Sequence, residues 1–503
     1  MNSPTHHMID QALFGYSDGH RQIASSVRLP PKDLYLLSSA TDLASGAFLA
    51  DGESYLSGLP LPESKRYALF RTWAAPEMPR PGCVWSHVFM LDARTSSSVA
   101  TVLPILRLFR RPTLAETAVY EQPLNVAIQQ GDTQTSRTDI VSEVISEYYA
   151  GNQVTLSPEI GEPEDIEKAM LSVWSQQWPR LRSSFSFCSA SLRENRRTDQ
   201  SDYNVQVAPK ESLVGNLPPD WAIFGAADAA KNSVTPLRRF LWRYGRDIVS
   251  PRRHYKLLVD LFQRFHSASF LPASSAAEVF RVLSTSSDGS VLKRDILGIG
   301  PSSPRLIPAV SASDFFKLLT SGTIPVEPDI DHVKQRLEEL TSKEIGTVAR
   351  CYGANRDALS AWKDIIFGSI VSLADKQSLT SEYPTDMVAD VLLAREDLID
   401  ADTLSLVDND VLPRLIKDET RASLAQTVMN EILRRDMGAL GNLIVASRPE
   451  FVFQSAVEAL CENRIKDSWL VVLAHHAGPI LAGAWLSHLK SSKEFAAALS
   501  ILR

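Results

Sequence analysis

The sequence has few cysteines, and their positions do not suit covalent or metal cross-links. Four cysteines occur in 503 residues, Cys83, Cys188, Cys351 and Cys461, and no two have the C-x-x-C spacing of a metal knuckle or redox site. A chain of this length is expected to form about three domains, each able to bury a core without disulfides. A reducing cytoplasm is therefore the expected location, and no metal ion or other cofactor is expected.

Long apolar runs and an N-terminal leader are also missing. Residues 1–10 contain two histidines and a proline, without the basic region and apolar core of a secretory signal. The longest uncharged stretch, residues 468–489, has His475, His476 and Pro479 at its centre. These residues would place polar groups and a helix break inside a bilayer. We expect two packed helices here and no membrane partner.

The sequence also lacks an excess of positive charge and a nucleotide-binding loop. Its net charge is −7, and residues 261–503 hold 25 basic and 31 acidic side chains. Because nucleic-acid affinity comes largely from neutralised phosphates, a nucleic-acid partner is not expected. The P-loop pattern G-x-x-x-x-G-K-[ST] does not occur, and Gly298-Ile-Gly300 is followed by Pro301 and lacks the third glycine of a dinucleotide fingerprint.

Apolar patterning divides the chain into three predicted domains. Residues 1–130 show the alternation typical of strands, with a hairpin turn at Ser17-Asp18-Gly19, and predict a strand-rich mixed domain with an antiparallel sheet. Residues 131–270 mix helical and strand patterns. Residues 271–503 are almost entirely helical, without a strict repeat period. The predicted fold class is α+β, with an irregular helical stack as its C-terminal half.

Individual elements follow from the spacing of apolar residues. The first domain is predicted to have strands at 67–73 and 83–91 and helices at 32–43 and 99–109. The second is predicted to have helices at 138–149, 163–178 and 237–244 and strands at 183–188 and 203–207. Helices of the C-terminal half are predicted at 330–340, 357–373, 386–393, 421–435 and 449–462.

Two patterns suggest a catalytic nucleophile. Residues 15–19, Gly-Tyr-Ser-Asp-Gly, have the spelling of a nucleophile elbow, but strand-like residues follow where the elbow needs a helix, so a hairpin turn is the preferred interpretation. The second pattern is Cys83 with His87 or His20, and with Asp18, as the nucleophile and base of a hydrolase or peptidase. Four strand residues span about 13 Å, so direct pairing of Cys83 would need His20. The alternative is a buried free cysteine beside a packed histidine.

Residues 237–256 alternate arginines with aromatic rings. Such a segment can hold an acidic partner protein or a phosphate backbone, so nucleic-acid sensing is kept as a further alternative. The other interpretation is an amphipathic helix that buries Phe240, Leu241 and Tyr244 and places its arginines at the rim. The candidate partner-binding residues are Arg238, Arg239, Trp242, Arg243 and Arg246.

Several stretches resemble a known family. Residues 9–20 (IDQALFGYSDGH), 55–62 (YLSGLPLP) and 71–87 (RTWAAPEMPRPGCVWSH) resemble the N-terminal domain, type one, of the bacterial GTPase-associated protein one family. Residues 178–188 and 238–245 resemble the family's middle domain. The helical C-terminal half is similar to the family in character alone.

The resemblance implies a place in multi-gene bacterial conflict systems, antiphage defence in particular, in which such a protein is encoded beside a GTPase. It implies contacts with that GTPase and with other proteins of the system, and it supplies no catalytic residues. A non-enzymatic adaptor or regulator of a GTPase is therefore the leading hypothesis. The Cys83 hydrolase and nucleic-acid sensing through residues 237–256 are the alternatives.

Overall fold

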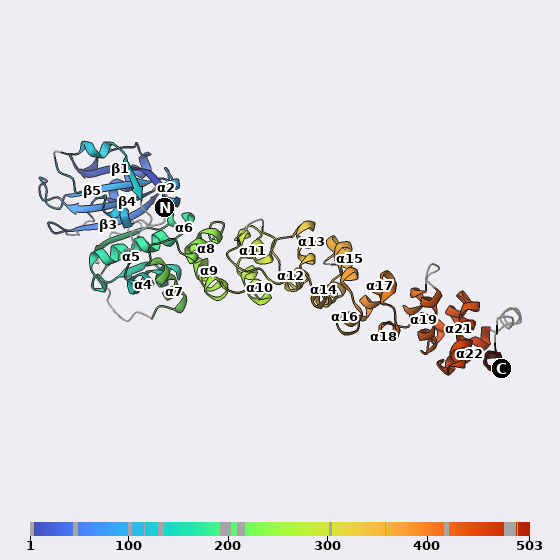
Figure 1. Cartoon of the computed structure of the whole chain (residues 1–503). Coiled ribbons are helices and arrows are strands. Elements are labelled where there is room, and N and C mark those ends of the chain that lie inside the picture. Colours follow the sequence, from blue (N-terminus) through green and yellow to red (C-terminus); the bar gives the residue numbers. More distant parts are fainter. Residues whose placement is uncertain are drawn as a thin grey trace. The chain divides into compact units, whose positions relative to one another are not determined.

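The computed structural model describes residues 5–43, 49–98, 103–114, 116–128, 135–191, 203–208, 217–300, 304–357, 359–416, 422–476, 489 and 491–502. The chain divides into two compact units. The first unit comprises residues 1–270, 282–296 and 300–308, and the second comprises residues 271–281, 297–299 and 309–503. The described strands all belong to the first unit, and the described elements of the second unit are helices, so the α+β prediction is confirmed (Figure 1).

A nine-stranded mixed sheet forms the centre of the first unit. Its order is β2-β1-β5-β4-β3-β8-β9-β7, and β6 pairs with β1. The pairs from β2 to β3 along this order are antiparallel, as expected for the first domain. Strand β8 also pairs antiparallel with β3, whereas β9 runs parallel to both β8 and β7. The strands are β1 (Thr5–Tyr16), β2 (His20–Ser25), β3 (Ser54–Leu61), β4 (Arg66–Ala74), β5 (Val84–Leu91), β6 (Leu124–Ile128), β7 (Val154–Leu156), β8 (Phe187–Ser191) and β9 (Val205–Val207).

The β1–β2 hairpin turns at residues 17–19, as predicted. Asp18 has a φ of 55° and Gly19 a φ of 111°, which are backbone conformations that these two residue types tolerate well. Leu13 pairs with Ala24 and Phe14 pairs with Gln22, so one extra residue forms a bulge in β2. Because a strand follows the turn, the hairpin interpretation of this segment is confirmed.

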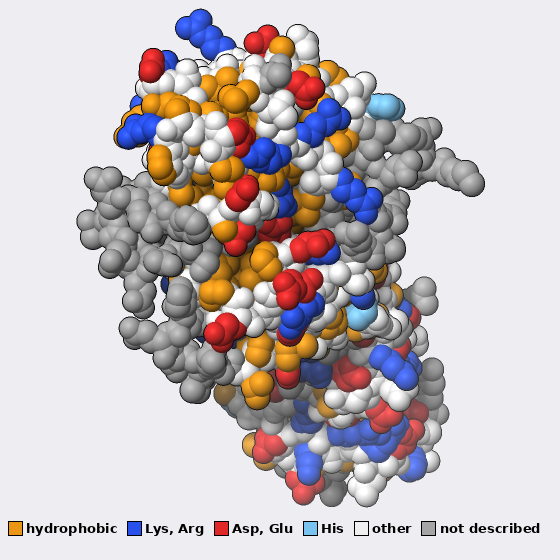
Figure 2. All heavy atoms as spheres, turned by 90° about the vertical axis from the view of Figure 1, so that its left-hand side faces the viewer, with side chains coloured by type: hydrophobic (Ala, Val, Ile, Leu, Met, Phe, Trp, Pro, Cys, Tyr) orange, Lys and Arg blue, Asp and Glu red, His pale blue; other side chains and the backbone are white. Residues whose placement is uncertain are grey.

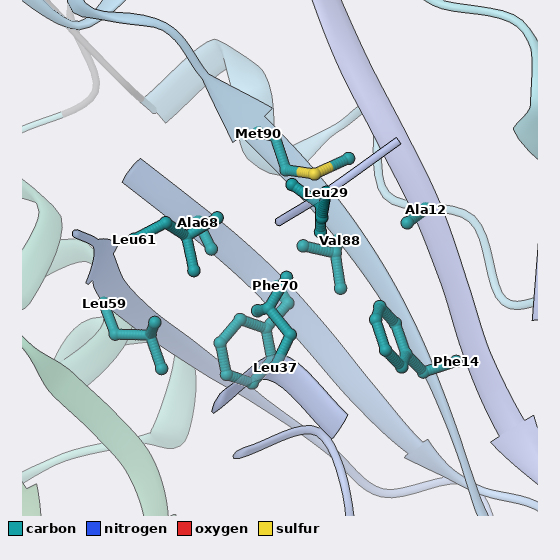
Figure 3. Packing of buried hydrophobic residues seen from close by; sticks show 10 residues of the cluster. All are labelled: Ala12, Phe14, Leu29, Leu37, Leu59, Leu61, Ala68, Phe70, Val88 and Met90. Carbon is teal, nitrogen blue, oxygen red and sulfur yellow. The ribbon is translucent and has the colours of Figure 1, made fainter. Parts of the chain in front are cut away.

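Helix α1 (Pro31–Ala40) covers one face of the sheet. Leu37 is fully buried and packs with apolar side chains of β1, β3, β4 and β5 (Figure 3). The buried carboxylate of Asp33 accepts the backbone N–H groups of Glu63 at 3.1 Å and Ser64 at 2.7 Å, in the turn between β3 and β4. These two bonds fix α1 against the sheet.

The opposite face is covered by α2 (Ala93–Ser98), α3 (Leu103–Leu106), the 3-10 turn η1 (Ala118–Glu121) and α5 (Pro163–Gln176). Trp174 of α5 lies against Tyr67 of β4, with ring centroids 5.0 Å apart. Pro163 and two acidic residues occupy the first turn of α5, where the helix dipole favours negative charge. The helix predicted at 99–109 is wrong in length, since α3 ends at residue 106; residues 99–102 lie outside the described part.

Further helices complete the first unit. They are α4 (Thr138–Tyr149), α6 (Pro179–Arg182), α7 (Asp220–Ala229), α8 (Pro236–Tyr244), α9 (Pro251–Phe265) and α11 (Ser290–Leu297), with the 3-10 turn η2 (Pro158–Ile160). The predicted helices of this region are confirmed within two residues. The strand predicted at 183–188 starts later, because Ser183, Ser184 and Phe185 bond back to the turn of α6.

The second unit is built from helices joined by short connections. They are α10 (Ala273–Val282), α12 (Ala312–Thr320), α13 (Ile330–Glu338), α14 (Ser342–Ala354), α15 (Lys363–Leu373), α16 (Lys376–Ser381), α17 (Thr385–Ala394), α18 (Ala401–Leu404), α19 (Ala422–Leu433), α20 (Ala439–Ser447), α21 (Pro449–Cys461), α22 (Asp467–His476) and α24 (Ser492–Leu502). Three 3-10 turns lie among them: η3 (Ser360–Trp362), η4 (Glu396–Leu398) and η5 (Leu412–Leu415). The helix predicted at 357–373 begins as η3 and continues as α15.

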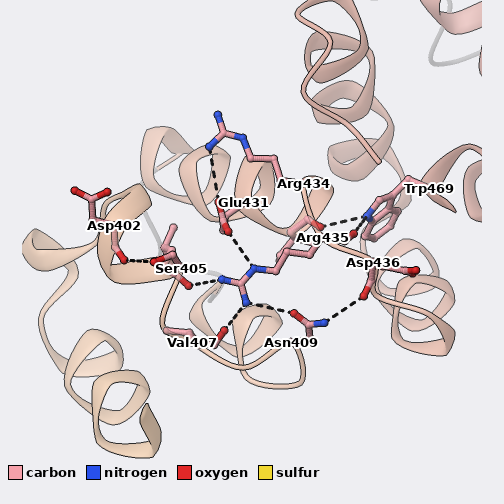
Figure 4. A network of polar contacts seen from close by, with 11 residues as sticks. Asp402, Ser405, Val407, Asn409, Glu431, Arg434, Arg435, Asp436 and Trp469 are labelled. Atoms are coloured by element: carbon pink, nitrogen blue, oxygen red, sulfur yellow. Dashed lines mark hydrogen bonds and ion pairs between the residues drawn. The ribbon is translucent and has the colours of Figure 1, made fainter. Parts of the chain in front are cut away.

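Polar contacts join helices of this stack that are distant in sequence. Arg435 donates to Glu431 Oε1 at 3.0 Å, to the carbonyl of Leu404 at 2.7 Å and to the carbonyl of Val407 (Figure 4). The indole N–H of Trp469 donates to the carbonyl of Arg435 at 2.9 Å. Contacts of this kind hold an irregular stack together where the sequence has no repeat.

No helix in the described ranges is long and apolar enough to cross a bilayer. Helix α22 occupies the start of the uncharged stretch 468–489, and residues 477–488 lie outside the described part. All four cysteines are free thiols.

Candidate functional site

Both ring nitrogens of His87, on β5, are engaged in hydrogen bonds. Nε2 lies 2.9 Å from Gln11 Oε1, and Nδ1 accepts the backbone N–H of Arg110 at 3.2 Å. The amide nitrogen of Gln11 donates to the carbonyls of Val119 and Gln122 at 3.0 and 2.6 Å, so Gln11 Oε1 is left to accept. His87 therefore carries its proton on Nε2 and has no free nitrogen for proton transfer.

Aromatic rings enclose the His87 imidazole. The ring centroids of Phe89, Tyr120 and Phe109 lie 4.5, 4.8 and 5.6 Å away, and His87 is 1% exposed. Burial, together with the charge of Arg110, lowers the pKa of His87 to about 3. The side chain is therefore neutral near pH 7 and belongs to the packing of this face.

His20 lies on the opposite face of the sheet. Its Nε2 is 3.0 Å from Thr41 Oγ1, and its ring stacks on Phe14 at 6.4 Å. Phe14 belongs to the core under α1, whereas Leu13, the cross-strand partner of His87, belongs to the core on the other face. Because adjacent strand residues point to opposite faces, the sheet separates the two histidines.

Cys83 and Asp18 lie apart from this pair. Cys83 precedes β5, is half-buried and packs against the cluster that contains Trp85. Asp18 lies at the exposed hairpin turn, with a carboxylate oxygen 3.8 Å from Arg21. Among the described residues, no hydrogen bond joins Cys83 to a histidine, and no three His, Cys, Asp or Glu side chains are placed to hold a metal ion. The structure thus distributes Cys83, His87, His20 and Asp18 over two faces and a turn.

Helix α8 confirms the amphipathic interpretation of the basic segment but corrects the position of one arginine. Phe240, Leu241 and Tyr244 are buried as expected. Arg238 is also buried, so the prediction that it lies at the rim is wrong. The buried stripe of α8 is wide enough to include position 238, and Asp228 lies close by. Burial lowers the pKa of Arg238 to about 10, and the charge of Asp228 opposes that shift.

Two further residues of the predicted partner-binding set, Trp242 and Arg243, form hydrogen bonds within the first unit. Arg243 donates to Asp295 Oδ2 through Nε at 3.1 Å and Nη2 at 2.7 Å, and the hydroxyl of Tyr244 donates to the same oxygen at 2.8 Å. The indole N–H of Trp242 donates to the carbonyl of Gln176 at 2.9 Å. The members of the predicted set that are exposed are Arg239 and Arg246.

A buried polar cluster in the first unit was missed by the sequence analysis. Gln176 donates to Asp228 Oδ2 at 2.8 Å and accepts the hydroxyl of Tyr255 at 2.7 Å. Tyr149 stacks flat on Tyr255, with ring centroids 3.6 Å apart. These residues come from α4, α5, α7 and α9. The sequence feature that indicates such a cluster is Gln176, a polar residue within the apolar stripe of α5. The cluster fixes the four helices relative to one another.

Helix α5 and strand β8 attach later residues to the N-terminal strands. β3 pairs with β8, and the N–H of Leu56 donates to Ser189 Oγ at 2.8 Å. Arg71 of β4 donates to Glu167 Oε2 of α5 at 2.5 Å, and Glu167 is buried. The sheet therefore continues past residue 130, where the sequence analysis placed a domain boundary.

One side of α1 remains exposed on this assembly. Tyr35 is 78% exposed, and beside it Lys32 pairs with Glu63 at 3.1 Å. Tyrosine is enriched in protein interfaces because it offers a large, rigid ring with a polar tip. We name Lys32, Tyr35 and Glu63 the α1 surface. The spacing of apolar residues predicts this helix but does not single out its exposed tyrosine.

Comparison with known proteins matches one part of the chain. Residues 8–109 match the family described as GTPase-associated protein 1, N-terminal domain type 1. This range includes α1, most of β1, and the strands β2 to β5. It does not include residues 178–188 and 238–245, so their resemblance to a middle domain stays a prediction. No curated protein and no solved structure matches the chain. Residues 8–109 of this protein are thus a GTPase-associated protein 1 N-terminal domain of type 1.

Proposed function

We propose that this protein is a non-enzymatic adaptor or regulator of a GTPase in a bacterial conflict system, one of antiphage defence. The observation that carries the proposal is the match of residues 8–109 to a GTPase-associated domain. The chain has no P-loop sequence, so the nucleotide is assigned to the partner. The partner GTPase and further proteins of the system are expected to be encoded nearby and to meet this protein in the cytoplasm.

The α1 surface is the proposed contact for the GTPase. On the sheet of the matched domain, α2, α3 and α5 cover one face, and β8, which follows the matched residues, pairs with the β3 edge. Helix α1 covers the other face and leaves Tyr35 exposed. Asp33 already fixes the helix in place, so binding through Tyr35 loses little conformational entropy.

The placement of charged residues favours a protein partner over nucleic acid. Arg238 is buried and Arg243 is paired with Asp295, so two of the predicted cations are directed inward. On the face shown in Figure 2, acidic and basic side chains are interspersed with hydrophobic ones rather than gathered into a basic field. A phosphate backbone would require such a field.

The geometry of the cysteine group gives less support to a hydrolase. A cysteine nucleophile needs a histidine with a nitrogen free to accept its proton. Both ring nitrogens of His87 are engaged in hydrogen bonds. His20 lies on the opposite face of the sheet from His87 and contacts Thr41. The adaptor function requires no catalytic role for these residues, and it is consistent with their packing on the two faces of the sheet.

Co-purification tests the proposal. The full chain is mixed with the GTPase encoded beside it, loaded with GDP or with a non-hydrolysable GTP analogue. We expect a complex in at least one state, and the variant Tyr35→Ala should weaken it about tenfold or more, as for a central interface aromatic. Phe270→Ala is the matched control, since Phe270 is also an exposed aromatic of the first unit, at 64%.

Absence of a complex in both nucleotide states would refute the adaptor function. A complex that forms but is insensitive to Tyr35→Ala would refute the α1 surface and leave the adaptor function standing. Equal weakening by Phe270→Ala would also refute the assignment to α1.

A further inference from the structure

An aromatic pocket opens on the second unit, lined by residues of α14, α15 and α17. Its volume is about 350 Å³, and its walls are Tyr352, Phe367, Asp390, Leu393 and Ala394. The rings of Tyr352 and Phe367 have centroids 6.4 Å apart and are tilted by 31°. The pocket thus combines two aromatic rings, two aliphatic side chains and one carboxylate.

A residue beside the pocket shows which chemical group this environment holds. Nη2 of Arg356 donates to Asp386 Oδ2 and to Asp390 Oδ2, each at 3.0 Å. The guanidinium carbon of Arg356 lies 5.7 Å from the ring centroid of Tyr352. A planar cation is therefore already held between an aromatic ring and carboxylates, which is the combination that attracts guanidinium groups.

The pocket retains hydrogen-bonding groups that Arg356 does not use. Asp390 Oδ1 and the hydroxyl of Tyr352 take no hydrogen bond from the described residues. Burial raises the pKa of Tyr352, the charge of Arg356 opposes that shift, and the carboxylates of Asp390 and Asp364 add to it. Three aspartates thus face one arginine around this ring, and the surroundings carry excess negative charge.

We propose that this pocket binds an arginine side chain from a basic segment of a partner protein. Its aliphatic stem contacts Leu393 and Ala394, and its guanidinium lies against the aromatic rings and donates to Asp390 Oδ1. A lysine fits less well, because its ammonium is compact, strongly hydrated and unable to stack. Free arginine fits less well too, since its own carboxylate would meet the aspartates. This contact is separate from the α1 surface and does not depend on the proposed GTPase adaptor function.

The experiment uses the full chain and blocked tripeptides. Ligand-observed NMR measures binding of acetyl-Gly-Arg-Gly-amide, of its lysine and citrulline counterparts, and of free arginine. We expect the arginine tripeptide to bind at least fivefold more tightly than each of the other three. The variant Asp390→Asn should reduce its binding at least fivefold. Asp397→Asn is the matched control, since Asp397 is an exposed aspartate paired with Arg395 and is not part of the pocket lining.

Several outcomes would overturn the proposal. Citrulline binding equal to arginine would exclude recognition of the cation, and free arginine binding equally well would exclude a protein segment as the ligand. An unchanged affinity in Asp390→Asn would exclude the assigned carboxylate. The citrulline comparison is made on the unmodified protein, so the test holds even if a variant folds poorly.

Discussion

Removing the carboxylate of Glu167 tests whether α5 and the N-terminal strands form one folding unit. Arg71 Nη2 lies 2.5 Å from Glu167 Oε2, and the two side chains are 18% and 4% exposed. Arg71 also donates to Ser54 Oγ at 3.0 Å, and Glu167 Oε1 accepts from Ser189 at 3.3 Å. Breaking a buried ion pair on one side costs about 3–5 kcal/mol, because the remaining charge stays buried without its counterion. Since Arg71 is partly exposed, we expect Glu167→Ala to cost about 3 kcal/mol.

A double variant separates the value of the pair from the cost of breaking it. Burial raises the pKa of Glu167, and Arg71 opposes that shift without cancelling it. The penalty of burying the carboxylate is therefore only partly offset by the ion pair. Replacing both partners by apolar residues of similar size is often neutral. We expect Arg71→Met with Glu167→Leu to be less destabilised than Glu167→Ala alone.

Hydrogen–deuterium exchange of the full chain is the assay, because a chain with two compact units need not unfold in a single transition. A loss of 3 kcal/mol corresponds to roughly 100-fold faster exchange in β4, β8 and α5, and peptides of the second unit serve as internal controls. Unchanged exchange in these three elements, or a double variant as unstable as Glu167→Ala, would refute the reasoning.

Two further predictions concern His87 and the arginines of α8. The folded state keeps His87 neutral, whereas the imidazole of the unfolded chain binds a proton below pH 6.5. The first unit should therefore lose stability as the pH falls from 6.5 toward 3. The loss is about 1.4 kcal/mol for each unit by which folding lowers the pKa of His87. Exchange measured across this range should depend less on pH in His87→Gln, and identical profiles would show that His87 is not the group responsible. Arg238→Glu places a carboxylate beside Asp228 in the interior and should cost about 3 kcal/mol or more, whereas Arg239→Glu on the surface should change stability by less than about 0.5 kcal/mol. Thermal unfolding of both variants checks this, and equal effects would contradict the burial of Arg238.

Local patterns predicted local structure well. The turn at Asp18 and Gly19 needs left-handed backbone, and a sequence of this type signals it directly. Helices α5 and α21 begin at a proline in their first turn, which the sequence also shows. In each case the physical cause lies within a few residues of its effect.

Non-local pairings were beyond the reach of the sequence. The parallel pairing of β9 with both β7 and β8 joins short strands, of which β7 and β8 are separated by helices, and no periodicity identifies such partners. The separation of His20 from His87 depends on strand register and on the bulge in β2. The width of the buried stripe of α8, which includes Arg238, is set by the helices packed on it rather than by its own period.

The hydrogen bonds of Asp33 determine which positions of this domain can change in sequence without moving α1. Its carboxylate binds the backbone N–H groups of Glu63 and Ser64, which every residue type except proline provides. Side chains in that turn are therefore free to vary among relatives, while position 33 is restricted to an acceptor of the same reach. Tyr35, held on the same helix, can be replaced without moving α1. Under the proposed contact through the α1 surface, a change of partner GTPase would need only an exchange of surface residues on a helix whose position stays constant.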